Sequence, residues 1–193
     1  MAASWEPAFR STMPSPSDDP RTLTRRSLRP EWGLSKMSES GAPKWKHDGV
    51  RIIPGTALDS NTAQTPGMGR KAAIDRARTG AQKIWAGTVS IRPDARTGAH
   101  HHGALESVIY VVRGRARMRW GENLEFVAEA CPGDFIFVPP FVPHQEINAS
   151  TSELLECVII RSDNEAVVVN LDITGVEKPD YVAWIDPIHR SVA

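Results

Sequence analysis

The second half of the chain is a series of short apolar runs of strand length, broken at intervals by Gly, Pro, Asn and Asp. Apolar runs of about four to eight residues between turn-forming residues predict β-strands. The expected strands cover residues 82–92, 99–103, 106–113, 115–120, 124–129, 134–138, 144–148, 153–161 and 166–171. Many short strands at regular spacing favour a sandwich or a barrel over an α/β fold. We therefore expect an all-β domain.

The segments that flank these strands differ in composition. The first 45 residues are rich in Pro and Ser without a sustained hydrophobic period, so they cannot bury enough apolar surface to offset their ordering entropy. A helix is expected only from Arg70 to Arg78, before Gly80. The 193 residues are thus divided into a flexible extension (1–45), a lead-in segment with one short helix (46–80), the barrel (81–175) and a C-terminal tail (176–193).

One predicted hairpin has a register that suits both of its faces. Residues 115–120 and 124–129 flank a three-residue loop, in which Asn123 suits the left-handed backbone conformation. Pairing Trp120 with Leu124 collects the apolar side chains on one face and sets arginines opposite glutamates on the other. We therefore predict this register, with the arginines on a solvated strand face.

Charge and cysteine content limit the functional classes. The 23 Lys and Arg balance the 23 Asp and Glu, so no overall field attracts nucleic acid or an anionic membrane. No apolar run approaches the ~18 residues of a membrane span. Cys131 and Cys157 form no CxxC motif, and the N-terminus lacks the pattern of a secretory signal. We expect a cytoplasmic protein with reduced thiols and no nucleic-acid or membrane partner.

Three histidines and one glutamate have the spacing of a metal site. His100, His102 and Glu106 have the same parity, so along a strand they lie on one face, whereas His101 points the other way. A second segment delivers His144 after a proline-stiffened loop. Imidazole and carboxylate together bind divalent transition metals, and they leave coordination positions open. We therefore predict that His100, His102, Glu106 and His144 bind a metal.

Two further side chains share the parity of these ligands. Tyr110 continues the face of Glu106, and Glu146 continues the face of His144. Either side chain could support the metal ligands or transfer a proton. The alternatives are a buried aromatic for Tyr110 and a solvated carboxylate for Glu146.

The two segments resemble the cupin superfamily, whose motifs are G(X)5HXH(X)3–4E(X)6G and G(X)5PXG(X)2H(X)3N. The second motif matches at Gly133, Pro139, His144 and Asn148, with Phe141 where Gly is usual. The first motif matches at His100, His102 and Glu106, with Asp94 at its leading Gly position and with Gly114 one residue late. That slip predicts a β-bulge between Glu106 and Gly114.

The resemblance implies a fold and a type of site. It implies an RmlC-like jelly-roll barrel (a double-stranded β-helix), a site of three histidines and one glutamate at the barrel mouth, and a homodimer. Octahedral coordination by this set leaves two positions for a small oxygen-rich substrate, or for substrate and dioxygen. The metal is expected to be Fe(II) or Mn(II), with Zn and Ni as alternatives.

Enzyme and binding protein both remain open from the sequence. The leading hypothesis is a dioxygenase-like enzyme that acts on a small oxygen-rich metabolite. A metal-dependent isomerase, decarboxylase or lyase is an alternative at the same metal. A non-catalytic cupin that binds or senses a small molecule is the alternative from another class, because a fold alone does not determine function.

Overall fold

The structure, a computed structural model, describes residues 49–62, 64–164 and 167–184. The predicted extension over residues 1–45 therefore lies outside the described residues. The helical elements are η2 (Gly55–Ala57) and α2 (Arg76–Thr79). The strands are β1 (Met68–Ile74), β2 (Trp85–Ile91), β3 (His100–His101), β4 (Ser107–Arg113), β5 (Ala116–Trp120), β6 (Phe126–Ala130), β7 (Phe135–Val138), β8 (His144–Asn148), β9 (Leu155–Arg161), β10 (Val169–Asn170) and β11 (Asp180–Tyr181).

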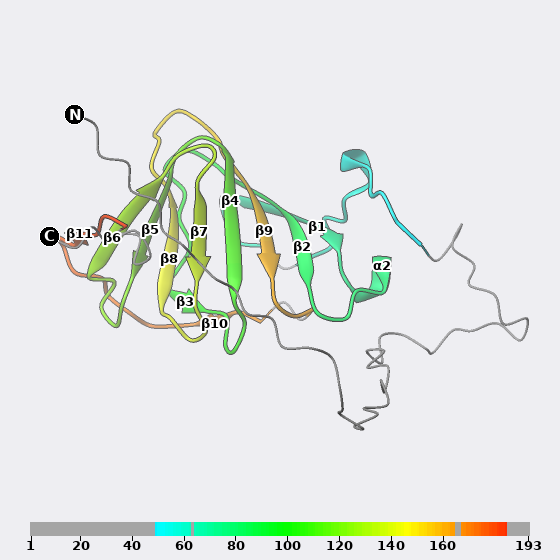
Figure 1. Cartoon of the computed structure of the whole chain (residues 1–193). Helices are drawn as coiled ribbons and strands as arrows, with labels where there is room; N and C mark the ends of the chain where they lie inside the picture. The colour runs from blue at the N-terminus through cyan, green and yellow to red at the C-terminus, as the bar shows by residue number, and fades with distance from the viewer. Residues whose placement is uncertain (1–48, 63, 165–166, 185–193) are drawn as a thin grey trace, which may run out of the picture. The chain divides into compact units, whose positions relative to one another are not determined.

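These strands form two sheets, as the jelly-roll prediction requires (Figure 1). One sheet has the order β1-β2-β9-β4-β7, and the other has the order β10-β3-β8-β5-β6-β11. Strands that are distant along the chain are therefore neighbours in space. The prediction of an all-β jelly-roll fold is confirmed.

Alternating side chains explain why these segments are strands. Burial in β2 alternates strictly from Trp85 to Ile91, and β9 alternates from Leu155 through Ile159. The side chains that face inward from both sheets form one core. Fully burying a side chain such as Leu155 or Ile159 contributes about 1.5–3 kcal/mol. The period of two thus places one face of each strand in the core.

The predicted helix over Arg70 to Arg78 is wrong for most of its length. Residues 70–74 belong to β1, which pairs antiparallel with β2. Only α2 is helical, with the Asp75 side chain accepting from the Arg78 amide at 2.7 Å and Gly80 in the left-handed conformation at φ 73°. Pairing with the exposed edge of β2 stabilises a strand here, which overrides the weak local preference for a helix.

The predicted hairpin register is also wrong, by two residues. Trp120 pairs with Phe126, and Arg117 lies opposite Glu129. Leu124 is buried at 2 % exposure within the loop, where it adopts a left-handed φ of 50°. Burying Leu124 in the loop lengthens the turn and moves the strand pairing. The expected charge pairing survives in part, because Arg115 Nε lies 3.4 Å from a Glu129 carboxylate oxygen.

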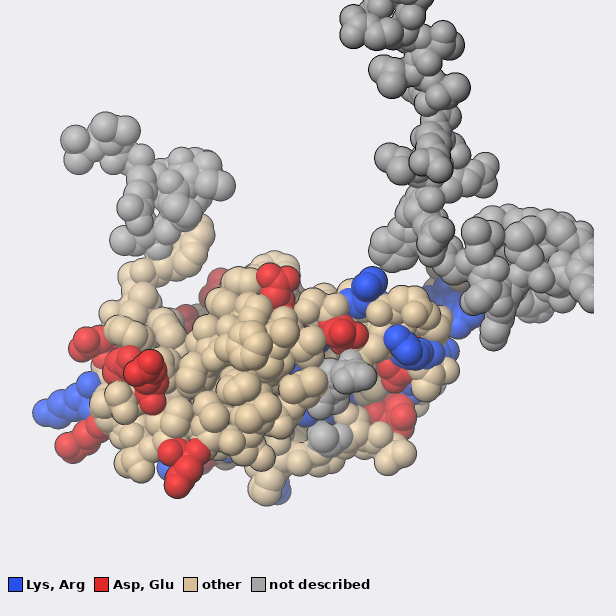
Figure 2. Space-filling view, turned by 90° about the horizontal axis from the view of Figure 1, so that it is seen from below, with Lys and Arg blue, Asp and Glu red and all other residues tan. Residues whose placement is uncertain are grey.

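The two sheets extend beyond residues 81–175. β1 adds a strand from the predicted lead-in segment, and β11 adds one from the predicted tail by pairing parallel with β6. Within the described residues, no helix has the length and apolarity to cross a membrane. Acidic and basic side chains both occur on the face shown in Figure 2, mostly toward its margins, around a broad uncharged region.

Candidate metal centre

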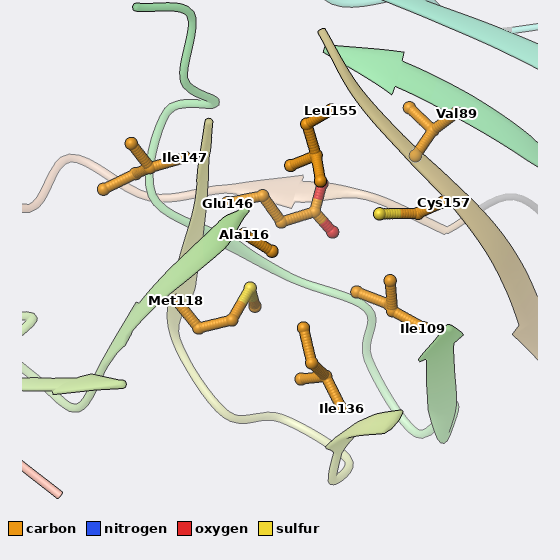
Figure 3. Close-up of a pocket in the computed structure, with 9 residues that line it drawn as sticks. All are labelled: Val89, Ile109, Ala116, Met118, Ile136, Glu146, Ile147, Leu155 and Cys157. Carbon is orange, nitrogen blue, oxygen red and sulfur yellow. The ribbon is translucent and has the colours of Figure 1, made fainter. Parts of the chain in front are cut away.

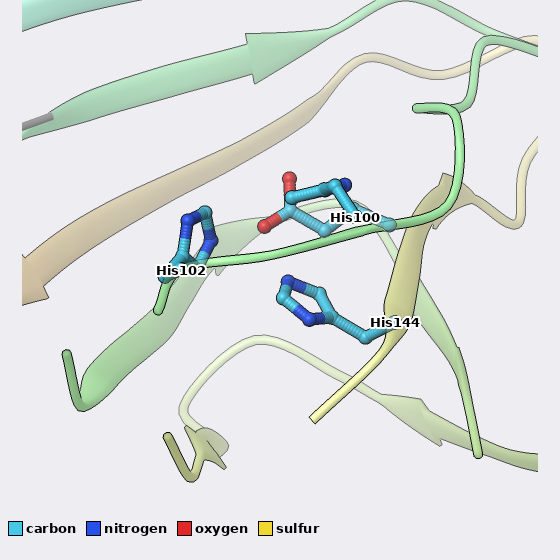
Figure 4. Close-up of side chains that lie close together, drawn as sticks. His100, His102 and His144 are labelled. Atoms are coloured by element: carbon cyan, nitrogen blue, oxygen red, sulfur yellow. The ribbon is translucent and has the colours of Figure 1, made fainter. Parts of the chain in front are cut away.

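Three imidazole rings lie close together where β3 and β8 are neighbours in the six-stranded sheet (Figure 4). β3 pairs with β8 at His100 and His144, which brings the two sequence segments together. The ring centroids of His100 and His144 are 4.4 Å apart, and His102 lies 5.0 Å from each. Together with Glu146, these residues offer four ligating atoms, all within 4.8 Å of one another.

Backbone carbonyls orient all three rings. The Nδ1 atoms of His100, His102 and His144 lie 3.0, 2.9 and 2.9 Å from the carbonyl oxygens of Gly98, Val167 and Val142, respectively. A carbonyl oxygen can only accept, so each Nδ1 carries the proton and donates. Each Nε2 then keeps its lone pair, which is the arrangement that metal-binding histidines need.

The surroundings favour the neutral imidazoles of His102 and His144. Burial and, to a smaller extent, the Arg161 guanidinium lower the pKa of His102 to about 3. Burial also lowers the pKa of His144, with a smaller contribution from His100. Desolvation disfavours the charged form of a histidine, and neighbouring positive charges act in the same direction. A neutral imidazole is the form that binds a metal.

Glu146 supplies the carboxylate of the cluster. Its side chain is 6 % exposed and extends among apolar residues of both sheets, such as Met118 and Leu155 (Figure 3). Among the described residues, its Oε2 atom has no hydrogen-bond partner, and neither has Nε2 of His144. Two hydrogen bonds join Thr97 to the Glu146 backbone. The Thr97 amide donates to the Glu146 carbonyl at 2.9 Å, and the Glu146 amide donates to the Thr97 hydroxyl oxygen at 3.0 Å.

Glu106 lies outside the cluster, contrary to the expectation that it points at the same centre as the histidines. Its side chain is exposed, and Ser107 takes the inward position at 2 % exposure. Strand β3 ends at His101, and a turn follows His102, in which Gly103 has a φ of 62°. The parity of His100 and His102 therefore does not continue to Glu106, because the alternation holds only along an unbroken strand.

Because of the same turn, the Tyr110 side chain lies on the opposite face of β4 from the predicted one. Ile109 and Val111 point into the core, whereas the Tyr110 ring is half-buried on the other face, 4.8 Å from the Phe135 ring. The expected inward position of Tyr110 is therefore wrong. The bulge predicted between Glu106 and Gly114 is confirmed by a register shift between Val111 and Arg113 in the pairing of β4 with β9.

Two residues replace glycines of the cupin motifs and keep the backbone conformation of glycine. Asp94 has a φ of 59°, and Phe141 has a φ of 60°. Both values lie in the left-handed region, which glycine adopts without strain. The Phe141 amide donates to the Gly103 carbonyl at 2.8 Å, so the loop before His144 is tied to the turn after His102. The motif geometry is preserved despite the substitutions.

Arg161 is a residue of the site that the sequence interpretation missed. It is 2 % exposed, and its Nη2 atom lies 3.4 Å from His102 Nε2. Its guanidinium also lies 5.8 Å from the centre of the Trp85 ring. Burial lowers its pKa to about 10, so it remains a cation at neutral pH. Its parity was a usable signal, because Leu155, Cys157 and Ile159 alternate inward ahead of it.

A cavity of about 760 Å³ reaches the cluster at His144. Its walls come mainly from β5, β6, β7 and the C-terminal segment that contains Tyr181 and Trp184. A cavity of this size lies within the range of ~300–1,000 Å³ that is usual for small-molecule sites. A small molecule in this cavity would lie beside His144.

The donor set fits a divalent transition metal. Three neutral imidazoles and one carboxylate are ligands typical of Fe(II), Mn(II), Zn(II) and Ni(II). The buried, unpartnered Oε2 of Glu146 and Nε2 of His144 would be costly to leave unsatisfied, and a metal at their common centre would satisfy both.

Residues 87–160 match the family described as "Cupin domain". The match covers both histidine segments and the strands between them. Together with the jelly-roll topology, this match shows a cupin domain over residues 87–160. A search of curated proteins finds no match.

Several solved structures have a similar fold. The polyketide cyclase RemF from Streptomyces resistomycificus is 21% identical, with 67% of this chain and 89% of that chain covered and a TM-score of 0.54. A conserved Klebsiella pneumoniae protein with a double-stranded β-helix domain is 15% identical, with 64% and 98% covered and a TM-score of 0.50. Bacillus subtilis oxalate decarboxylase is 22% identical, with 56% of this chain covered and a TM-score of 0.49. The chain spans only about 29% of that decarboxylase chain. At these identities the similarity shows the fold alone.

Proposed function

We propose that the chain is a metal-dependent enzyme that acts on a small organic molecule with oxygen donors. The observation that carries this proposal is the convergence of three histidines and Glu146 on one centre, beside a cavity that reaches His144. A metal with a purely structural role needs no adjacent space for another molecule. The cavity therefore favours an enzyme over the alternative of a protein in which the metal is only structural.

The side chains of the chain would hold the metal and shape its surroundings. His100, His102 and His144 would bind through Nε2, and Glu146 would bind through a carboxylate oxygen, which offsets one positive charge. When bound, a divalent metal supplies Lewis acidity, and as Fe(II) it also allows reaction with dioxygen. The apolar residues around Glu146 exclude water, which strengthens the electrostatic interactions inside the site.

Glu146 therefore takes a different role from the proton transfer expected of it in the sequence. As a ligand it cannot at the same time serve as a free general base. Tyr110 has no part in the proposed reaction, because its ring lies on the other face of β4. We propose dioxygenase-like chemistry as the leading reaction, with isomerisation, decarboxylation or lyase chemistry as alternatives.

Oxygen uptake separates these reactions. The protein, loaded anaerobically with Fe(II), would be offered small acids and enols in an oxygen electrode, and the products would be analysed in parallel. Uptake that matches product formation supports a dioxygenase, and product without uptake supports the alternatives. Metal binding without any turnover would favour a binding or sensing protein. The Glu146→Gln variant is the negative control, and Glu106→Gln is its matched exposed counterpart.

We also propose that the protein is cytoplasmic and forms a homodimer. The structure leaves Cys131 and Cys157 as free thiols, which suits a reducing compartment. Large apolar side chains are exposed at the edge strand β7, namely Phe135 at 72 % and Phe137 at 58 %. Such side chains are common in subunit interfaces. Light scattering of the purified chain would test the homodimer.

A further inference from the structure

We propose that the molecule bound at the metal centre has an apolar body about the size of an aromatic ring system, which fills the cavity next to His144, and an oxygen-donor head that reaches the metal. This inference rests on the proposed metal-dependent function and specifies its substrate class. It departs from the small oxygen-rich metabolite expected from the sequence, because most of the molecule would be apolar.

The inner surface of β6 creates the space. Ala128 and Ala130 point into the sandwich opposite Met118 and Ala116 on β5. Large residues at these positions would fill the gap between the sheets, as Leu155 and Ile159 do elsewhere in the core. The small alanine side chains leave part of the interior open, and this open part belongs to the same cavity as His144.

The walls of the cavity suit an apolar occupant. The lining side chains are mostly apolar or aromatic, including Trp120, Ile136, Val138 and Val142. No Lys or Arg occurs among the described residues that line the cavity. A ligand with several negative charges would therefore lose its hydration without gaining a cationic partner there. An apolar body gains free energy simply by leaving water.

The acidic residues of the wall do not alter this conclusion. Glu129 lines the cavity, but its carboxylate is bound by Arg117 at 2.8 Å and by Arg115 at 3.4 Å. Asp134 accepts from the Cys131 amide at 2.8 Å. Both carboxylates are thus engaged by other parts of the protein. The cavity is therefore largely neutral, and His144, which we propose to bind the metal, is its main polar contact for a ligand.

Aromatic side chains of the C-terminal segment border the cavity, namely Tyr181 and Trp184. Phe135 and Phe137 also line it from β7, but the Phe135 ring lies against Tyr110 on the outer face of that sheet. Tyr181 and Trp184 are 68 % and 80 % exposed, so they are available to cover a bound molecule. Flat aromatic side chains pack well against an aromatic ligand.

Two hydroxamates test this inference, because they share a metal-binding head and differ in the body. Acetohydroxamate has a methyl group, whereas 2-naphthohydroxamate has two fused rings. Both would be titrated into the Co(II)-loaded full-length protein. The visible absorption of Co(II) reports that the head has bound the metal, and calorimetry gives the Kd. We expect 2-naphthohydroxamate to bind at least about tenfold more tightly, because its rings leave water.

A pair of variants on one strand supplies the matched control. Ala128→Leu fills the cavity, so it should remove most of the preference for the naphthyl compound while the affinity for acetohydroxamate stays the same. Val127→Leu adds the same type of side chain on the other face of β6, and it should keep the preference. Thermal melting of both variants would confirm that each is folded. If either variant fails to fold, the affinities of the two hydroxamates for the unaltered protein still test the inference.

Equal affinity of the unaltered protein for the two hydroxamates would overturn the inference. A naphthyl affinity that falls as the protein concentration rises would also overturn it, because a second copy of the chain would then occupy the cavity. Neither result would affect the proposed metal-dependent function. Failure to retain Co(II), with no change in its absorption, would instead refute the proposed function.

Discussion

His144 and Glu146 lie two residues apart on β8 and point into the same interior, and each ends in a buried polar atom without a hydrogen-bond partner in the part of the chain that the structure describes. Their parity on an unbroken strand sets this arrangement. Trp120 and Met118 on β5 are their respective pairing partners, so both residues lie in the middle of a sheet rather than in a loop. A rigid sheet therefore positions one imidazole and the carboxylate of the cluster.

Replacing Glu146 with Gln should reduce metal affinity by roughly a hundredfold, because the only carboxylate of the cluster loses its charge. Glu106→Gln should leave the affinity unchanged, since the Glu106 side chain is exposed. Metal content of the purified variants, followed by metal titration, provides the measurement. Loss of metal from Glu106→Gln alone would show that the carboxylate ligand has been misassigned.

His102→Ala and His144→Ala should each lose most of the bound metal, while the barrel remains folded. His101→Ala should retain the metal, because its Nδ1 accepts from the Gly103 amide at 2.9 Å and it does not belong to the cluster. Elemental analysis and circular dichroism of the three variants would test this. The opposite pattern, with metal lost only from His101→Ala, is incompatible with the geometry of β3.

The metal-free protein should lose stability below about pH 6.5. The pKa of His102 is lowered from 6.5 to about 3, so at intermediate pH the unfolded chain binds a proton that the folded chain does not. The free energy of unfolding should therefore fall by up to about 1.4 kcal/mol per pH unit from this histidine, and the lowered pKa of His144 acts in the same direction.

Thermal melts at a series of pH values provide the measurement of this pH dependence. The Tm should be nearly constant above neutrality and should fall progressively in acid. His102→Gln should show a shallower fall. Identical pH profiles for the variant and the unaltered protein would exclude His102 as the source.

Arg161→Met should raise metal affinity several-fold and raise the pKa of His102. The guanidinium lies 3.4 Å from His102 Nε2, where it competes for the lone pair and repels a second cation. Arg161→Lys keeps the charge and is the matched control. Metal titration and NMR of the His102 ring would report the two effects. A loss of affinity in Arg161→Met, with the fold intact, would mean that the arginine supports the metal instead.

Only Cys131 should react with an alkylating reagent in the folded protein. Cys157 is buried, and burial together with a smaller contribution from Glu146 raises the pKa of its thiol to about 12. The thiolate is the reactive form, so Cys157 stays inert near neutral pH. Mass spectrometry after iodoacetamide treatment should show modification at Cys131, which is exposed. Rapid modification of Cys157 would indicate that the sandwich opens readily.

The strands and the three histidines were predictable because both depend on local patterns. Short apolar runs between turn-forming residues identified β2, β4, β8 and β9 with small errors at their ends. The parity of His100 and His102 holds in the structure, as does that of His144 and Glu146. Each of these relationships lies within a single strand or directly beside one, where the period of two applies.

The tertiary structure alone decided which carboxylate joins the histidines, and the reason is the turn after His102. The turn at Gly103 interrupts the alternation of inward and outward side chains, so Glu106 is exposed and Ser107 is buried. Similarly, β1 is a strand because β2 offers it an unpaired edge, which the sequence of residues 68–74 does not reveal. The sequence by itself determined the residue pattern of each strand, whereas the packing of strands distant along the chain determined which side chains meet.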